Sequence, residues 1–376
     1  MASSGPTAQP IRVERLETRA YTIPTDLPEA DGTASWNATT IIIVHVYGGG
    51  RVGLGYTYTH ACAAALIDDK LSAVVSGVDA LDPPGAWRAM QVAVRNFGRE
   101  GIAATAISAV DVALWDLKAQ LLQQALASVL GRFRERMPIY GSGGFTSYDD
   151  AQLTRQLSGW VERDGCRSVK MKIGSHPEHD PARVATAKRA IGAATLFVDA
   201  NGAYGVRQAQ ALGRRFSEEH DVRWFEEPVS SDDLRGLCTV RNHVPAAMEV
   251  AAGEYGYTPG YFRRMLESGA VSVLQADATR CGGITGFMQV AALCEAFHTD
   301  LSAHCAPALH LHLGCAAPRF RHLEWFHDHE RVERLLFDGA PKPRDGTIGP
   351  DLMRAGLGLT LKRQDAERYA AGSDSQ

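Results

Sequence analysis

The amino-acid sequence predicts an α/β fold, in which a (β/α)8-type barrel of parallel strands follows a smaller α+β domain. From Met137 onward, short apolar strands alternate with helical segments, which is typical of parallel sheets and barrels. An ionisable residue closes seven successive apolar runs, at intervals of 20 to 28 residues: Lys172, Asp199, Glu226, Glu254, Asp277, His304 and Glu324. Each interval is long enough for one strand, one helix and two loops. With a first strand at "MPIYG", the pattern indicates eight strands whose ends meet at one rim of a barrel.

The first part of the chain, residues 1–133, has the pattern of the α+β domain. "TTIIIVHVYGGGRVGLGYTY" predicts a β-hairpin with its turn at Gly48 to Arg51. The polar segment from Pro24 to Asn37 is rich in residues that break regular structure, so we expect a mobile loop there. "TAISAVDVALWDLKAQLL" predicts a helix, because its apolar residues recur at helical spacing: Ile107, Val110, Leu114, Leu117 and Leu121.

Residues 134–342 are assigned to the barrel, and one segment of this part shows the local signals well. In "HDPARVATAKRAIG", Asp180 can cap a helix, Pro181 suits its first turn and Gly192 can end it. The segment lies between "SVKMKI" and "TLFVDA", which both have the continuous apolar character of buried strands.

Composition excludes several functional classes. The 376 residues carry a net charge of −4 with a pI near 6.4, which gives no sign of a surface for nucleic acid or membrane. The longest apolar strand-like run, "TTIIIVHV", is too short to span a bilayer, and the first residues lack the apolar core of a signal peptide. Seven cysteines without a C-x-x-C pair suit reduced thiols, so we expect a cytoplasmic protein whose cysteines are mostly buried small hydrophobic residues.

Three consecutive strand ends offer carboxylates: Asp199 in "FVDAN", Glu226 in "WFEEP" and Glu254 in "AAGEY". Carboxylate oxygens on rigid neighbouring strands suit a hard divalent cation, and Mg²⁺ takes a few carboxylates while keeping open positions. Glu227 competes with Glu226, but side chains alternate along a strand, so we expect only one of the two to point inward.

Lys170 and Lys172 in "VKMKIG" are two residues apart, so both face the same side of a strand. We expect mutual repulsion and burial to lower their pKa values. One lysine can then accept a proton while the other holds a substrate carboxylate.

On the far side of the expected barrel, Asp277 can orient His304 and fix its tautomer. Glu324, if protonated, can hydrogen-bond a substrate carboxylate. A metal between two opposed bases fits removal of the proton α to a carboxylate, because the resulting enediolate needs concentrated positive charge.

These motifs, in this order and spacing, resemble the enolase superfamily and within it the mandelate racemase subgroup. The resemblance covers nearly the whole chain and rests on the following segments: "AISAVDVALWDLKAQLL", "VKMKIG", "LFVDANGAY", "WFEEPV", "AAGEYGY", "LQADATRCGGITG", "LSAH" and "HLEWF". It implies an N-terminal capping domain joined by the C-terminal tail, residues 343–376, over a (β/α)7β modified TIM barrel. Similar proteins are often dimers or octamers, so a homo-oligomer is expected.

The resemblance also implies roles for individual residues. Mg²⁺ is expected on the three carboxylates, with Lys172 and His304 as acid–base residues on opposite faces of the substrate. Lys170 and Glu324 match residues that contact the substrate carboxylate, and Asn201 matches a polar neighbour of the substrate. Arg280 stands where racemase-like members can carry a lysine, which slightly favours a dehydratase.

Two reactions share this machinery: dehydration of a hydroxylated acid, often an acid sugar, to a 2-keto-3-deoxy acid, and racemisation or epimerisation of a 2-hydroxy acid. We favour dehydration by analogy. A non-catalytic ligand-binding barrel is a further alternative, although such a protein would be expected to have lost a base or a metal ligand.

Substrate specificity is expected to come from cap segments over the barrel mouth, with Trp36, Tyr56, Tyr58 and His60 as candidates; ordinary hairpin packing explains them equally well. A dedicated zinc site at His310 and His312 is not expected, because residues two apart on a helix face different ways and no cysteine spacing supports zinc. The Gly-rich "YGGGRVGLG" is not followed by the helix of a dinucleotide-binding unit.

Overall fold

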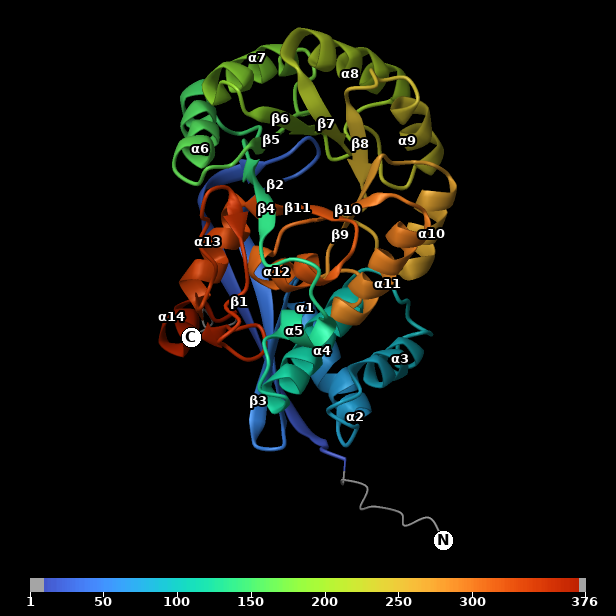
Figure 1. Cartoon of the computed structure of the whole chain (residues 1–376), viewed down its shortest axis with the longest axis vertical. Helices are drawn as coiled ribbons and strands as arrows, with labels where there is room; N and C mark the ends of the chain where they lie inside the picture. The colour runs from blue at the N-terminus through green and yellow to red at the C-terminus, as the bar shows by residue number, and fades with distance from the viewer. Residues whose placement is uncertain (1–9, 372–376) are drawn as a thin grey trace.

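A closed ring of parallel strands forms the centre of the fold (Figure 1). The computed structural model describes residues 10–371, and in it β4 pairs with both β5 and β11, which closes the ring. In ring order the strands are β4 (Met137–Gly143), β5 (Ser168–Lys172), β6 (Thr195–Asp199), β7 (Val222–Glu226), β8 (Glu249–Ala252), β9 (Val273–Ala276), β10 (Asp300–Ala303) and β11 (Phe320–Phe326). The predicted α/β barrel is therefore confirmed, with its eight strands in chain order.

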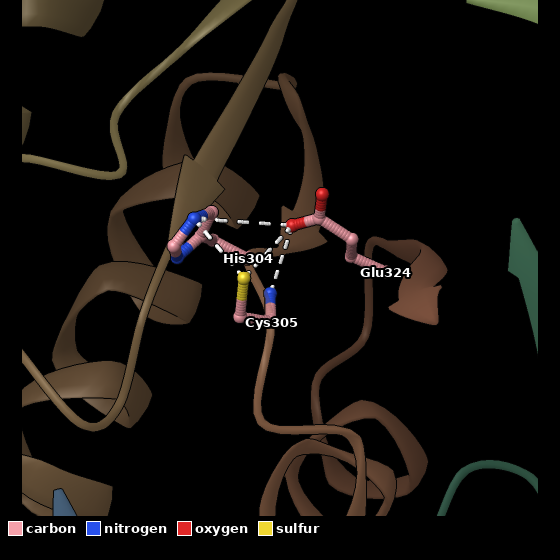
Figure 2. Close-up of side chains that lie close together, drawn as sticks. All are labelled: His304, Cys305 and Glu324. Carbon is pink, nitrogen blue, oxygen red and sulfur yellow. Dashed lines mark hydrogen bonds and ion pairs between the residues drawn. The ribbon is translucent and has the colours of Figure 1, made fainter. Parts of the chain in front are cut away.

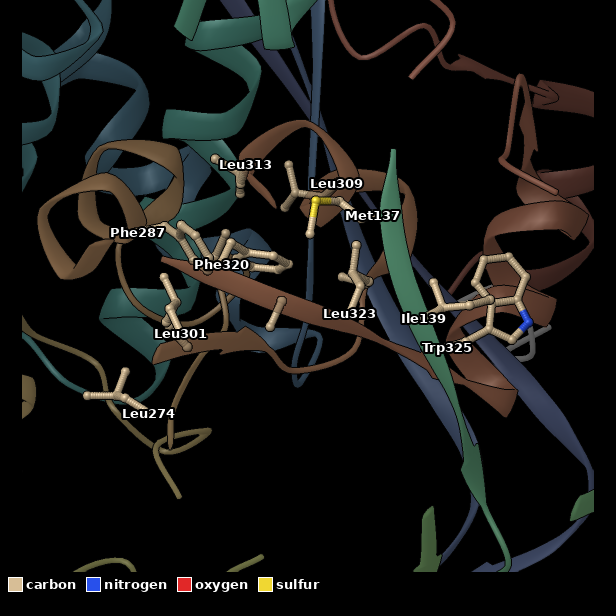
Figure 3. Close-up of a cluster of buried hydrophobic side chains, with 14 of the residues drawn as sticks. Met137, Ile139, Leu274, Phe287, Leu301, Leu309, Leu313, Phe320, Leu323 and Trp325 are labelled. Atoms are coloured by element: carbon tan, nitrogen blue, oxygen red, sulfur yellow. The ribbon is translucent and has the colours of Figure 1, made fainter. Parts of the chain in front are cut away.

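Helices cover the outside of the ring (Figure 1). They are α6 (Asp150–Glu162), α7 (Asp180–Ile191), α8 (Val206–His220), α9 (Leu234–Arg241), α10 (Pro259–Glu267), α11 (Gly283–Ala296), α12 (Pro307–Ala316) and α13 (His327–Leu336). The outward-facing residues of the strands pack against these helices. Figure 3 shows part of this layer, where side chains of the strands meet side chains of α11 and α12: Leu301, Leu323, Phe287 and Leu309.

An aromatic layer fills the inside of the ring. Phe197 and Trp224 stack with their ring centroids 5.1 Å apart, and Tyr140 packs against both rings. Lys170 pairs in register with Phe197, so it lies in the same layer, whereas Lys172 pairs with Asp199 two residues closer to the barrel mouth. The inside of the ring is thus a packed core, in which Lys170 and His322 lie among the aromatic side chains.

The N-terminal part consists of an antiparallel sheet, in the order β1 (Val13–Ala30), β2 (Ser35–Gly48) and β3 (Arg51–Tyr58), with helices on one side. The helical segments are α1 (Cys62–Leu66), η1 (Ile67–Leu71), α2 (Ser72–Val75), α3 (Pro83–Ala93), α4 (Ile102–Leu121) and α5 (Leu126–Leu130). The predicted hairpin turn is confirmed by the pairing of Gly48 with Arg51, and α4 confirms the predicted helix.

The expectation of a mobile loop from Pro24 to Asn37 is wrong, because β1 continues to Ala30 and β2 begins at Ser35. The pairing resumes after an irregularity, with Glu29 opposite Trp36, whose Nε1 donates to Glu29 Oε2 over 2.7 Å. Asp31 Oδ1 accepts hydrogen bonds from the backbone N–H groups of Thr33 and Ala34 and so fixes the turn. The polar residues that suggested a loop hold an ordered hairpin together.

The expected helix-capping role of Asp180 is also wrong. Asp180 is the first residue of α7, and its side chain accepts hydrogen bonds from the Gly174 N–H and the Tyr204 hydroxyl. Pro181 lies in the first turn and Gly192 ends the helix with a φ of 58°, as predicted.

Helix α4 is fixed to the barrel through two buried polar side chains, and to the C-terminal segment through a third. Ser108 Oγ accepts from the backbone N–H groups at Gly282 and Gly283, and Asp111 accepts from Thr285, all near the start of α11. Asp116 accepts from the N–H groups of Leu54 and Leu357. On its other side α4 lies so close to β3 that a Cβ at Gly55 would come within 2.1 Å of Ala109 O.

The C-terminal segment returns to both parts of the molecule. β13 (Thr347–Ile348) pairs with β4, and β14 (Thr360–Leu361) pairs with β12 (Phe337–Asp338). After α14 (Arg363–Ala366) and η2 (Glu367–Tyr369), the Ala371 N–H donates to Ala20 O of β1. Within residues 10–371, no helix combines the length and the apolar character that crossing a membrane requires.

The buried carboxyl group of Glu29 leads to a prediction about stability. Burial, with Asp328 nearby, raises its pKa to about 8 from an ordinary 4.5. The unfolded chain therefore loses this proton at lower pH than the folded protein, so the stability contributed by the group is complete below pH 4.5 and declines until the pH has passed 8. Glu29→Gln cannot ionise and keeps an acceptor for Trp36. We expect it to be more stable than the wild type at pH 8.5, by up to about 5 kcal/mol, but not at pH 4.5.

Thermal unfolding followed by circular dichroism between pH 4.5 and 9 measures this difference. Glu135→Gln, at an exposed carboxylate, serves as the matched control. A difference between Glu29→Gln and the wild type that does not grow with pH would contradict the expectation.

Candidate active site

The structure brings the predicted strand-end residues together at one rim of the barrel. Lys172, Asp199 and Glu226 are the last residues of β5, β6 and β7. Asp277 and His304 directly follow β9 and β10. Glu254 comes two residues after β8, and Glu324 lies within β11. Because parallel strands present their carboxyl ends on the same side, all seven side chains belong to the barrel mouth.

A cavity of about 480 Å³ lies between the hairpin of β1 and β2 and this rim. Its lining includes Trp36, Thr39, Tyr58 and His60 from the N-terminal part, together with Lys172, Asn201, Glu254, Arg280, His304 and Cys305 from the barrel. A larger cavity, of about 560 Å³, lies beside α6 and α13, and its lining contains none of the predicted site residues. The cavity at the mouth is therefore the one that can bring a ligand to these groups.

Asp199, Glu226 and Glu254 each place a carboxylate oxygen within 4.8 Å of the other two. All three residues are buried, and within the described residues Glu254 Oε2 has no hydrogen-bond partner. Gly253, with a φ of 137°, lets the chain turn after β8, because a Cβ there would lie 2.1 Å from Gln275 O. Three hard oxygen ligands, one of them unpartnered, fit Mg²⁺.

Glu227 is also buried, but only Glu226 of the two adjacent acids belongs to the three-carboxylate cluster. The φ of Glu227, 36°, departs from strand geometry, so strict alternation of side chains does not apply there. Burial and the neighbouring Glu254 raise the pKa of Glu227.

The two lysines are surrounded by carboxylates. Lys170 Nζ lies 2.5 Å from Glu226 Oε1 and 2.7 Å from Glu324 Oε1, and Lys172 Nζ lies 2.5 Å from Asp199 Oδ2. Burial alone would lower the pKa of each lysine, but these carboxylates outweigh burial and raise it. The predicted depression of both pKa values is therefore wrong for the metal-free protein. Lys170 is fully buried and is not among the residues that line the cavity.

Asp277 and His304 form the predicted pair, with Nδ1 of the imidazole 2.8 Å from Asp277 Oδ2. Burial would raise the pKa of Asp277, but the hydrogen bond and charge of His304 hold it well below its usual range. The other ring nitrogen, Nε2, lies 3.4 Å from Glu254 Oε2 and 3.2 Å from Cys305 Sγ. Asp277 therefore orients the imidazole of His304 through Nδ1, and Nε2 points toward the site.

Glu324 does not match the expected protonated acid. Burial would raise its pKa, but Lys170 and His304 hold it well below the ordinary value, so the group is a carboxylate. Its Oε1 accepts from Ser142 Oγ, and its Oε2 accepts from the Cys305 N–H over 2.9 Å. In Figure 2 the carboxylate of Glu324 lies beside Cys305. Glu324 is not among the residues that line the cavity.

The residues expected to set specificity fall into two groups. Trp36, Tyr58 and Asn201 line the cavity; Tyr58 stacks on His329, and Asn201 Oδ1 is buried without a partner in the described residues. Tyr56 does not reach the cavity, because it is fully buried and its hydroxyl donates to Glu333 Oε1 over 2.7 Å. Tyr56 and Tyr58 are two residues apart and lie on the same face of β3, but Tyr56 is held by Glu333 of α13.

Cys305 and Arg280 line the cavity, and no chemical role was predicted for either residue. Arg280 lies 3.7 Å from both Glu254 Oε1 and Asp277 Oδ2. Cys305 was expected to be a small buried hydrophobic residue, and only its position directly after His304 indicated otherwise. Four non-glycine residues with positive φ follow barrel strands at this rim: Asn201, Glu227, Cys305 and Ala306. Such backbone strain is common at functional sites.

His310 and His312 are buried, and their ring nitrogens contact backbone groups. His310 Nε2 accepts from the Ala278 N–H and its Nδ1 contacts Cys305 O. His312 contacts the Ala127 N–H and Leu357 O.

Two protein families match the chain in succession. Residues 16–131 match the family described as "Mandelate racemase / muconate lactonizing enzyme, N-terminal domain". Residues 152–366 match the family described as "Enolase C-terminal domain-like".

Individual proteins are similar over nearly the whole chain. A solved structure of a mandelate racemase/muconate lactonizing enzyme-like protein from Rubrobacter xylanophilus is 52% identical, covers 96% of this chain and 100% of its own, and has a TM-score of 0.94. The 3,6-anhydro-alpha-L-galactonate cycloisomerase of Streptomyces coelicolor is 30% identical over 96% of this chain and its own full length. The L-talarate/galactarate dehydratase of Salmonella typhimurium, solved with Mg and L-lyxarohydroxamate, is 27% identical over 98% and 96% of the two chains, with a TM-score of 0.88.

The three-carboxylate geometry predicts that Mg²⁺ stabilises the folded protein. At a hundred times its dissociation constant, a bound ion contributes about 2.7 kcal/mol. We expect Mg²⁺ to raise the Tm of the wild type and to have little effect on Asp199→Asn. Glu249→Gln, at the opposite end of β8, is the matched control and should respond like the wild type. Thermal unfolding with and without Mg²⁺ measures the shift within each variant, and an undiminished shift in Asp199→Asn would exclude this site.

Proposed function

Because the chain belongs to the mandelate racemase / muconate lactonizing enzyme family of the enolase superfamily, we propose that it is a Mg²⁺-dependent enzyme acting on a small hydroxylated carboxylic acid. The reaction removes the proton α to the carboxylate through an enediolate and, in our proposal, dehydrates a sugar acid to a 2-keto-3-deoxy acid. The observation that carries the proposal is that Lys172 and His304 line one cavity beside three converging carboxylates.

Lys172 is proposed as the base that takes the α-proton, because its Nζ ends at the cavity between β5 and the carboxylates. When bound, Mg²⁺ supplies positive charge that stabilises the enediolate and offsets the carboxylates that raise the pKa of Lys172. The charge of Lys170 also lowers the pKa of Lys172 and favours the neutral base.

His304 is proposed as the acid. Asp277 holds Nδ1, which leaves Nε2 to carry the proton that the departing β-hydroxyl needs. Lys172 takes the α-proton, the electrons of that C–H bond form the enediolate, and the C–O bond to the β-carbon breaks as His304 protonates the hydroxyl, which leaves as water. The enol that remains tautomerises to the keto acid.

Substrate contacts are proposed for the cavity residues Asn201, Trp36 and Tyr58, with the guanidinium of Arg280 available for an oxygen of the substrate. Lys170 and Glu324 are proposed to act from beneath the cavity. Lys170 holds Glu226 in place, and Glu324 holds the backbone N–H of Cys305 next to His304.

Racemisation or epimerisation is the second candidate, and one observation favours keeping it. Lys172 and His304 come from β5 and β10, on different sides of the ring, and both reach the cavity. Either residue can then remove a proton that the other returns from the opposite face.

We also propose that the protein acts in the cytoplasm as a homo-oligomer, without nucleic-acid or membrane partners. The net charge of −4 and the exposed apolar residues Val92, Phe97 and Ile102 on the N-terminal part support this proposal. Sedimentation velocity on the full chain can test the oligomeric state.

The function is tested by incubating sugar acids with the enzyme and Mg²⁺ in D₂O. We expect the wild type to form a keto acid. Lys172→Ala should lose at least about 100-fold in both keto-acid formation and deuterium incorporation at the α-carbon of the unconverted acid. His304→Asn should lose product formation but retain exchange, because Lys172 remains. The exposed His243→Asn is the matched control.

If the α-carbon of the acid inverts its configuration and no new carbonyl group forms, the reaction is racemisation and not dehydration. Exchange that survives in the Lys172→Ala, His304→Ala double variant would contradict both reactions. If acids bind but none of them exchanges its α-proton, the protein is a non-catalytic ligand-binding barrel.

A further inference from the structure

His304, Cys305 and Glu324 place three different metal-ligating atoms around one point beside the cavity (Figure 2). Cys305 Sγ lies 3.2 Å from His304 Nε2 and 3.5 Å from Glu324 Oε2, and the latter two atoms are 4.0 Å apart. In a tetrahedral zinc site with ordinary bond lengths, such ligand atoms are separated by about 3.4 to 3.6 Å. The three atoms therefore need shifts of only a few tenths of an ångström to bind one ion.

The surroundings of these atoms resemble those of protein zinc sites. Metal-bound histidines usually hydrogen-bond a carboxylate through their second ring nitrogen. Here Nδ1 of His304 makes this hydrogen bond with the carboxylate of Asp277. Glu324 is fixed through its other oxygen by Ser142 and Lys170. All three ligand residues are buried, with 6%, 2% and 1% of their surface exposed. The ligands are thus already held, and little ordering is needed on binding.

One coordination position is open. His304 and Cys305 line the cavity of about 480 Å³, whereas Glu324 is not among its lining residues. A water molecule or a substrate oxygen in the cavity can therefore complete a tetrahedron, as in zinc sites that keep an exchangeable position. Glu254 Oε2, buried and without a hydrogen-bond partner in the described residues, lies 3.4 Å from His304 Nε2 and adds negative charge beside the site.

The ligand set differs in kind from the carboxylate triple. Asp199, Glu226 and Glu254 offer only hard oxygens, which suit Mg²⁺. A thiolate and an imidazole instead favour softer ions such as Zn²⁺ or Co²⁺. The sequence could not suggest this site, because two of its ligands are adjacent and the third comes from the next strand.

We propose that His304 Nε2, Cys305 Sγ and Glu324 Oε2 form a second metal site. The ligand set favours a divalent cation that prefers thiolate ligands, namely Zn²⁺, and a water molecule in the cavity is the fourth ligand. On binding, the Cys305 thiol releases its proton to solvent and binds as the thiolate. The ion occupies the nitrogen with which His304 would protonate a leaving group, so the site acts as a reversible inhibitory switch. This last consequence rests on the proposed function, whereas the binding itself does not.

Cobalt(II) is the probe for the experiment, because a cobalt–thiolate bond gives a charge-transfer absorption that oxygen ligands do not give. Co²⁺ is added to the full chain saturated with Mg²⁺. We expect one thiolate-bound Co²⁺ per chain, displaced by an equivalent of Zn²⁺. Cys305→Ser should lose the absorption, and Cys62→Ser, which removes an exposed thiol, should keep it.

Absence of a thiolate absorption in the wild type would overturn the proposal without recourse to any variant. An absorption that survives in Cys305→Ser, or one that disappears in Cys62→Ser, would also overturn it. Circular dichroism and the Mg²⁺-induced rise in Tm establish that Cys305→Ser is folded. Since no turnover is measured, failure of this site leaves the proposed reaction untouched.

Discussion

The buried charge of Lys170 is the interaction on which the site depends. Its ammonium group, with no exposed surface, contacts Glu226 on one side and Glu324 on the other, and it lies 3.5 Å from Asp199. Carboxylates crowded this closely inside a barrel would repel one another and be costly to desolvate, and removing one partner of a buried ion pair typically costs about 3–5 kcal/mol. Burial would raise the pKa values of Asp199 and Glu324, but the charges of Lys172 and Lys170 hold the pKa of Asp199 below its ordinary value, and that of Lys170 holds the pKa of Glu324 well below its own.

The second constraint is the way in which the N-terminal part is held over the barrel. Ser108 and Asp111 of α4 bind the start of α11, which follows the strand that carries Asp277. The hairpin of β1 and β2 then forms the roof of the cavity through Trp36, whose position depends on Glu29. A rigid floor of strand ends and a roof held by buried hydrogen bonds thus enclose the acid–base groups, in keeping with the proposed proton chemistry.

The sequence predicted the barrel and the meeting of its strand ends, because the period of strand and helix is visible in the chain. It failed where several residues distant in sequence act together. The pKa shift of Lys172 was predicted from its neighbour Lys170, but the carboxylates of other strands outweigh that repulsion. Composition suggested a loop at Pro24 to Asn37, although specific hydrogen bonds make it a hairpin. The contact between Cys305 and Glu324 joins residues of different segments, so no spacing within one segment could reveal it.

In our proposal, Asp199, Glu226 and Glu254 hold one divalent ion while Lys172 and His304 face each other across the acid above it. The most direct measurement is a crystal structure with Mn²⁺ and a slowly reacting substrate acid, in which anomalous scattering locates the metal. The account predicts a single strong peak bonded to the three carboxylates, with Lys172 Nζ and His304 Nε2 on opposite sides of the α-carbon. A metal bound elsewhere, or an acid whose α-carbon touches neither base, would contradict it.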